Sequence, residues 1–264
     1  MARASARASG PGATLAGVTR RALLAFALAK SLLLLPAAAV AVDPGYYVVT
    51  AYDNAGVAAA DFRYWTVRPP GEPTAIWPEA GLGYGVSSRW YTEVFASWIG
   101  ASDMATRLSS WNWQNEYLLT QGESPIDLAI HAMLVRDADR GTWEIEYGPV
   151  LQTDVGRTQL NANVFFDRGL SSANSDRPAR MKYQWQVKYR WMRLLNVGAQ
   201  GFGELGPWND WWPRAQQSHR AGPAAFGTWD VPGGHAVLYQ AAWLWGSVYG
   251  SRASMFSMRV QYTF

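Results

Sequence analysis

Few residues of this chain could perform covalent chemistry. The 264-residue sequence contains no Cys and three His, so nucleophilic catalysis would need a Ser, a His base and a polar group that orients the base. Ser218 and His219 are adjacent, whereas we expect His131 to be a hydrogen-bonded interior residue and His235 to flank a turn. A catalytic triad is defined by geometry rather than by residue order. A hydrolytic enzyme is therefore an alternative and not the preferred interpretation.

Neither a metal centre nor a bound cofactor is expected. Without Cys, thiolate sites for zinc or iron–sulfur clusters are excluded, and a metal would need His or carboxylate ligands. The segment Gly201–Gly206 matches the G-x-G-x-x-G pattern, but Pro207 and Pro213 follow where a dinucleotide-binding fold needs a helix. We interpret these glycines as strand residues that run into a loop. The alternating glycines of 81–85 would leave room for an aromatic neighbour or mark a bulge.

Charged and amide side chains instead indicate a polar passage. They recur at every second position, and side chains two residues apart lie on one face of a β-strand. Those predicted to face the interior of a closed sheet are Glu93, Glu116, Asp127, Glu144, Glu146, Lys182, Gln184, Gln186, Lys188, Arg190 and Arg259. The acidic residues precede the basic ones, so we expect an acidic wall opposite a basic wall and a field that filters polar solutes. The alternative is that these charges pair across the interior and plug it.

Alternation of apolar and polar residues identifies the elements that position these side chains. From Met181 to Trp191 apolar residues hold every odd position and polar residues every even one, and Phe256–Phe264 repeats the pattern. A period of two indicates strands with one apolar and one polar face. Together with weaker alternation elsewhere it predicts twelve strands, at 58–67, 79–87, 89–99, 109–120, 125–136, 142–153, 158–167, 180–192, 195–205, 218–229, 234–246 and 253–264.

The predicted connections alternate in length. Longer ones fall at 68–78, 100–108, 168–179 and 206–217, between short ones at 87–88, 121–124, 154–157, 192–194 and 230–233, with the short 137–141 as an exception. An even number of strands of about ten residues, joined in this way, is typical of a transmembrane antiparallel up-and-down β-barrel. We therefore predict an all-β barrel over 58–264. The sequence leaves three alternatives for residues 42–57: a lead-in to the barrel, an extension of the first strand, or a thirteenth strand.

The first 41 residues have the features of a cleaved signal peptide. Four arginines precede an apolar stretch that ends in Ala39-Val40-Ala41, a small-x-small cleavage pattern. Lys30 and Pro36 interrupt this stretch, which disfavours an uncleaved membrane anchor. Cleavage after Ala41 removes five of the 23 basic residues and none of the 20 acidic ones, so the net charge falls from +3 to −2. A nucleic-acid partner is therefore not expected.

Tryptophan is unusually frequent, with 15 residues in the chain. Trp and Tyr are favoured at the two interfaces of a membrane, and the predicted outward faces carry Trp90, Trp98, Trp111, Trp143, Trp185, Trp191, Trp243 and Trp245. A soluble β-sandwich also alternates, but it would have to bury most of these rings. We therefore expect contact with outer-membrane lipids. The Trp-rich loop 206–214 could fold into the lumen or rest on the outer interface.

Several segments resemble known proteins. The terminal alternation, which includes Tyr262 and Phe264, resembles the C-terminal signal of bacterial outer-membrane β-barrels, which in that class is read by the barrel-assembly machinery. More narrowly, the chain resembles a group of largely uncharacterised proteobacterial outer-membrane proteins in Tyr147-Gly148-Pro149, Gly156-Arg157-Thr158, QWQVKYRW (184–191), QGFGELGPW (200–208) and SHRAGP (218–223). The likeness covers most of 80–264. It implies fold and an outer-membrane location, and it brings no catalytic residues and no substrate.

These observations favour a narrow passive channel for small solutes across the outer membrane. Twelve strands lie between small barrels filled by side chains, with about 8 strands, and open porins, with about 16. The alternatives are an outer-membrane lipid-acting enzyme and a plugged barrel without transport. The His-x-Ser-Asn-Gly signature of the outer-membrane phospholipase family is absent from the sequence.

Overall fold

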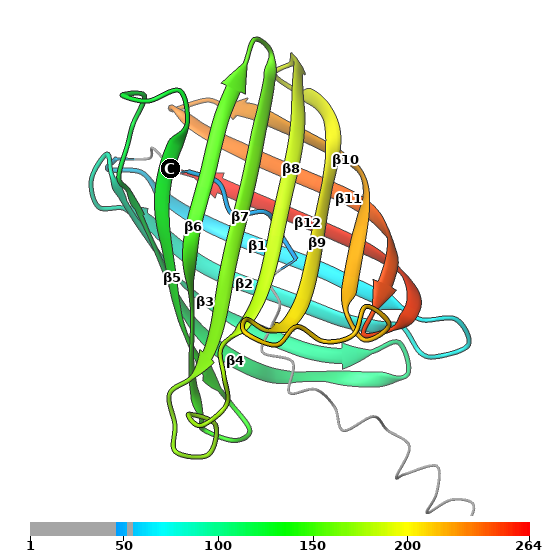
Figure 1. Cartoon of the computed structure of the whole chain (residues 1–264). Helices are drawn as coiled ribbons and strands as arrows, with labels where there is room; N and C mark the ends of the chain where they lie inside the picture. Colours follow the sequence, from blue (N-terminus) through cyan, green and yellow to red (C-terminus); the bar gives the residue numbers. More distant parts are fainter. Residues whose placement is uncertain (1–45, 52–54) are drawn as a thin grey trace, which may run out of the picture. The chain divides into compact units, whose positions relative to one another are not determined.

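The structure is a computed structural model that describes residues 46–51 and 55–264, so the predicted signal peptide lies outside the described residues. Twelve antiparallel strands form one closed barrel in which each strand pairs with its chain neighbours (Figure 1). They are β1 (Ala58–Arg68), β2 (Ala75–Gly85), β3 (Trp90–Ala101), β4 (Met104–Leu118), β5 (Asp127–Asp137), β6 (Trp143–Val155), β7 (Thr158–Gly169), β8 (Arg180–Met192), β9 (Leu195–Pro207), β10 (Ser218–Val231), β11 (His235–Val248) and β12 (Ser251–Thr263). The predicted all-β barrel is confirmed.

Closure of the barrel leaves neither terminal strand with a free edge. β1 pairs with β12 in a register that includes Phe62↔Val260. Beyond that ladder, the backbone N–H of Phe264 donates to the carbonyl of Ala58 over 3.0 Å, and the N–H of Ala58 donates back over 3.2 Å. In hydrocarbon every backbone polar group must pair internally, and a closed sheet achieves this. Among the described residues, no helix has the length and apolar character needed to cross a membrane.

The two faces of the barrel wall follow the predicted alternation. In β8, Lys182, Gln184 and Gln186 are buried inside, whereas Val187 and Trp191 are 37% and 53% exposed. The outer face also carries exposed apolar and aromatic side chains on the other strands, among them Leu82, Val94, Ile130, Val197, Trp111, Trp243 and Trp245. An apolar outer face around an interior that carries many charged and amide side chains is the pattern of a barrel surrounded by lipid.

Some predicted strand ends are wrong. No long loop exists at 100–108, because β3 reaches Ala101 and β4 begins at Met104. Register shifts at Ser97/Trp98 and at Ile99/Ala101 show β-bulges there, which break the period of two while pairing continues. β2 also begins at Ala75 rather than at 79.

The glycine-rich segment of β9 is strand, as predicted, and not a nucleotide-binding turn. A Cβ on Gly201 would collide with the indole of Trp185, and one on Gly203 would collide with the ring of Tyr183. Both rings belong to the neighbouring strand β8. The glycines therefore make room for aromatic side chains on the outer face of the barrel wall.

Candidate functional site

The interior of the barrel contains buried charges that form local clusters. The first cluster, the Arg63 cluster, lies on β1, β2, β3 and β12. The Arg63 guanidinium lies 3.0 Å from Asp61, 2.6 Å from Glu93 and 3.7 Å from Glu79. The Arg259 guanidinium lies 2.5 Å from Asp61 and 3.7 Å from Glu93. These five side chains are nearly or fully excluded from solvent, so ion pairing compensates the loss of their hydration.

The second cluster, the His131 cluster, lies on β4 to β8. His131 Nε2 lies 3.0 Å from a Glu146 oxygen, and His131 Nδ1 lies 3.7 Å from a Glu116 oxygen. Lys182 forms ion pairs with Glu146 and with Asp167, the latter over 3.2 Å. The prediction that His131 is a hydrogen-bonded interior residue is therefore confirmed.

The expected separation into an acidic wall and a basic wall is wrong. Arg63 stands among the carboxylates of β1, β2 and β3, and Lys182 stands beside the carboxylates of β6 and β7. A buried charge without a partner costs several kcal/mol, so opposite charges lie next to one another instead of facing each other across the lumen. The charges therefore pair locally and are not separated into two walls.

A short N-terminal segment, Tyr46–Ala51, lies inside the barrel. Figure 1 shows it in blue, crossing the interior behind the wall of green and yellow strands. Tyr46, Tyr47, Val48 and Val49 are each at most 4% exposed. The segment is not a strand of the sheet, and Ala55 forms an isolated bridge to Gly85 of β2.

Side chains of the segment contact opposite parts of the wall. Tyr46 and Val48 pack in one apolar cluster with residues of β1 and of β9 to β12, whereas Tyr47 and Val49 pack in another with residues of β4 to β7. Because alternate side chains of an extended chain point in opposite directions, four consecutive residues reach both sides of the lumen.

Hydrogen bonds hold the segment in place. The Tyr46 hydroxyl donates to Glu204 over 2.8 Å, and the Tyr47 hydroxyl donates to Gln114 over 2.5 Å. The backbone N–H of Val49 donates to Gln184 Oε1 over 3.0 Å, and its carbonyl accepts from Asn163 Nδ2 over 2.8 Å. The segment is therefore bound to β4, β7, β8 and β9.

Its two tyrosines also contact buried arginines. The Tyr47 ring lies 3.9 Å from the Arg63 guanidinium carbon, and the Tyr46 ring lies 4.3 Å from that of Arg220. Arg220 in turn lies 2.5 Å from Glu204. A desolvated guanidinium over an aromatic face adds about 2 kcal/mol of attraction, so the segment is part of the interior and not a loose tail.

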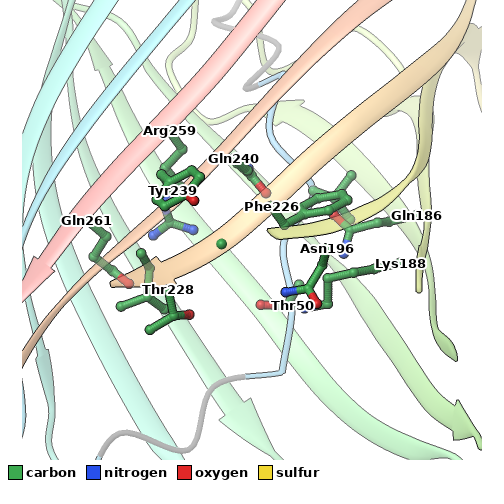
Figure 2. A pocket seen from close by; sticks show the side chains of 13 residues that line it. Thr50, Gln186, Lys188, Asn196, Phe226, Thr228, Tyr239, Gln240, Arg259 and Gln261 are labelled. Atoms are coloured by element: carbon green, nitrogen blue, oxygen red, sulfur yellow. The ribbon is translucent and has the colours of Figure 1, made fainter. Parts of the chain in front are cut away.

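An internal cavity of about 140 Å³ remains beside the segment. Val48 and Thr50 of the segment form one side, and residues of β8 to β12 form the rest of the lining. Figure 2 shows Gln186, Lys188 and Asn196 on one side of this space and Arg259 on the other. The cavity is thus the polar space that the segment and the charge clusters leave unfilled.

The other predicted interior residues lie towards the ends of strands. Glu144 lies 3.6 Å from Arg180, and Arg190 lies 2.9 Å from Asp154. Asp127 accepts a hydrogen bond from the backbone N–H of Gly122 over 2.6 Å. These residues belong to neither interior cluster.

The residues predicted as an assembly signal lie on the outer face. Tyr262 and Phe264 are 37% and 54% exposed, and their ring centroids are 5.9 Å apart. In the Trp-rich loop, Trp208 and Trp211 are more than half exposed, so their rings are not buried in the lumen.

The Ser–His pair does not form a catalytic unit. Ser218 is fully buried and accepts a hydrogen bond from the backbone N–H of Tyr249, whereas His219 contacts the Tyr183 hydroxyl over 2.9 Å. Adjacent residues of a strand point to opposite faces, so His219 cannot take the Ser218 proton. No group of residues suited to hold a metal ion occurs in the part of the chain that the structure describes.

Sequence reasoning missed several interior residues. Asp61 and Arg63 are two positions apart on β1, so they share a face, and this spacing of opposite charges was a usable signal. Glu204 and Arg220 also lie in the interior phase of their strands, where they form an ion pair. The insertion of Tyr46–Ala51 has no comparable signal, because a run of four apolar residues does not specify what it packs against.

Comparison with known proteins identifies the architecture. The COG4313 outer membrane channel from Pseudomonas putida F1 superposes with a TM-score of 0.58 at 10% identity, over 84% of this chain and 100% of that one. The chain has the fold of bacterial outer-membrane channels. The NanC porin matches with a TM-score of 0.53 at 11% identity, over 78% of this chain and 98% of that one. Neither a family model nor a curated protein matches the sequence, so the likeness is one of structure.

Proposed function

We propose that this protein is a narrow passive channel for small polar solutes across the bacterial outer membrane. The observation that carries the proposal is the polar cavity beside Tyr46–Ala51, inside a closed barrel with an apolar outer face. A solute crossing such a barrel exchanges water for amide and charged side chains, so passage needs neither a cofactor nor an energy source. Two solved structures with the same fold carry the names channel and porin, which supports this assignment.

In this proposal, Tyr46–Ala51 and the two charge clusters restrict the size of the solute. The clusters lie against the part of the wall formed by β1 to β8 and β12. The segment crosses the lumen between the two apolar clusters that it contacts. The remaining route runs past the cavity lined by β8 to β12. The expected partners are small solutes, the lipids around the barrel and, during biogenesis, the barrel-assembly machinery.

Conductance tests the proposal directly. Chain 42–264, refolded in detergent and checked by heat-modifiable gel mobility, is added to planar lipid bilayers. We expect small, uniform conductance steps that heat-unfolded protein does not produce. A correctly folded barrel that gives no current and no solute-driven swelling of proteoliposomes would show a plugged barrel and refute the channel. The lipid-acting alternative predicts hydrolysis of phospholipid that the His219→Ala variant loses.

A further inference from the structure

The lining of the internal cavity has an uneven charge. Lys188 and Arg259 contribute cationic groups, and neither Asp nor Glu is among the lining residues. Arg259 is already engaged, because its guanidinium binds Asp61 over 2.5 Å. The cationic character available to a solute therefore resides chiefly in Lys188.

Lys188 differs from the other basic residues of the interior phase of β8. Arg180 pairs with Glu144, Lys182 pairs with Glu146 and Asp167, and Arg190 pairs with Asp154. In the part of the chain that the structure describes, no carboxylate forms an ion pair with Lys188. Its ammonium lies 5.8 Å from the centroid of the Phe226 ring instead. An ammonium that is partly withdrawn from water without an anion is a ready partner for one.

The surroundings of Lys188 suit an anion that also carries hydroxyl groups. Gln186, Asn196 and Gln240 line the same cavity with amide donors and acceptors. The Gln186 side-chain oxygen is buried and accepts no hydrogen bond from the protein. A hydroxyl of a bound solute would supply the missing donor.

The size of the cavity favours a small ligand. A water needs about 10–15 Å³ of such space, so a cavity of about 140 Å³ holds several waters or a small solute. Exchange of those waters for a solute with several hydroxyl groups preserves their hydrogen bonds, whereas an apolar solute would leave amide groups unpaired.

From these contacts, we infer that the cavity is a binding subsite for small hydroxylated monocarboxylates, such as sugar acids, with the carboxylate held by the Lys188 ammonium. Gln186, Asn196 and Gln240 would bind the hydroxyl groups, and the face of Phe226 would cover the carbon chain. The inference deepens the proposed channel by naming a class of solute, and it rests on that channel for the route of entry.

Binding and conduction are measured separately, so that the two proposals can fail independently. Refolded chain 42–264 in detergent is titrated with gluconate and with glucose, a neutral molecule of similar size, by calorimetry at constant ionic strength. We expect gluconate to bind more tightly than glucose, and Lys188→Gln to weaken gluconate binding about tenfold or more, the loss typical of a charge-assisted hydrogen bond. Lys188→Arg keeps the charge and should retain binding.

Arg190→Gln is the matched control. It removes the same charge two positions along β8, where the side chain is outside the cavity lining, and it should leave gluconate affinity unchanged. Equal binding of gluconate and glucose, or an unchanged affinity in Lys188→Gln with native gel mobility, would overturn the subsite. If the protein conducts in bilayers but shows no such binding, the channel is supported and the subsite is refuted. If it shows Lys188-dependent binding but no conductance, the subsite is supported and the channel is refuted.

Discussion

Removal of the luminal segment should widen the pore. We predict that a chain beginning at Thr50 or later, which lacks Tyr46–Val49, forms the same barrel and conducts more current. The segment contributes no strand to the sheet, and its partners include polar side chains such as Gln114, Asn163 and Gln184. These side chains can bond to water once the segment is gone. We therefore expect the wall to form without the segment.

The size of the effect follows from the geometry of the barrel. Twelve strands spaced about 4.8 Å apart and tilted by about 40° give a backbone radius of about 12 Å. Side chains reach inward by about 5 Å, half the distance between packed sheets, which leaves a cross-section of about 150 Å². An extended chain with its side chains occupies about 4.8 Å by 10 Å, or about 50 Å². The segment thus fills about one third of the space, and its removal should raise conductance at least about 1.5-fold.

Single-channel recording provides the assay. The truncated chain is compared with chain 42–264 in the same lipid and salt, after both have passed the gel-mobility test for folding. The double variant Tyr46→Ala with Tyr47→Ala, which keeps the backbone and removes both rings, should give an intermediate conductance. The matched control is Trp208→Ala with Trp211→Ala, because these exposed rings lie on a loop and their loss should leave the conductance unchanged.

An unchanged conductance in the well-folded truncated chain would refute the reasoning. That result would mean either that the ions follow a route past the segment, or that the clusters of paired charges alone determine the width of the pore. A truncated chain that fails to fold would refute the premise that the wall stands without the segment, and the double tyrosine variant would then measure the constriction by itself.

Other predictions test the faces and the buried charges. Val187→Arg on the lipid face should destabilise the barrel by about 2–4 kcal/mol, whereas Gln186→Arg beside the cavity should be tolerated; urea unfolding in vesicles compares them, and equal stability would contradict the assigned faces. Lys182→Met strands two buried carboxylates and should cost about 3–5 kcal/mol, whereas Lys188→Met should cost about 1 kcal/mol or less in the same assay. Phe264→Ala should lower the amount of folded barrel recovered in the outer-membrane fraction, as judged by gel mobility, if the terminal residue acts as an assembly signal.

The barrel itself could be predicted because lipid and lumen impose opposite demands on alternate residues. Met181–Trp191 shows both demands without exception, so β8 was predicted with its ends as the structure has them. Near Ser97 and Ile99 the bulges shift the register, the alternation is lost, and the prediction of a loop failed. A pattern of period two reports pairing only where the strand is regular.

The arrangement inside the lumen could be predicted only in part. The phase of β8 predicts Lys182 and Lys188 in the interior, but the sequence does not say which carboxylate each ammonium meets. Partner choice depends on the stagger between strands, which sets Gln159 opposite Lys188 and Phe165 opposite Lys182. Strand order alone suggests opposite acidic and basic walls, because it does not contain the stagger that decides which side chains are neighbours. The insertion of Tyr46–Ala51 was beyond reach, since its partners come from both halves of the barrel.

The pairing of charges divides the lumen into two parts with different roles. Around Arg63 and His131, every described carboxylate has a cationic or hydrogen-bonding neighbour, so substitutions there should act on stability. Around Lys188 the protein leaves a cation without an ion pair and a buried amide oxygen without a hydrogen bond, next to empty volume. Because unpaired polar groups are costly in an interior, they persist where something outside the protein satisfies them. Substitutions at the cavity should therefore change which solutes pass, with little change in stability.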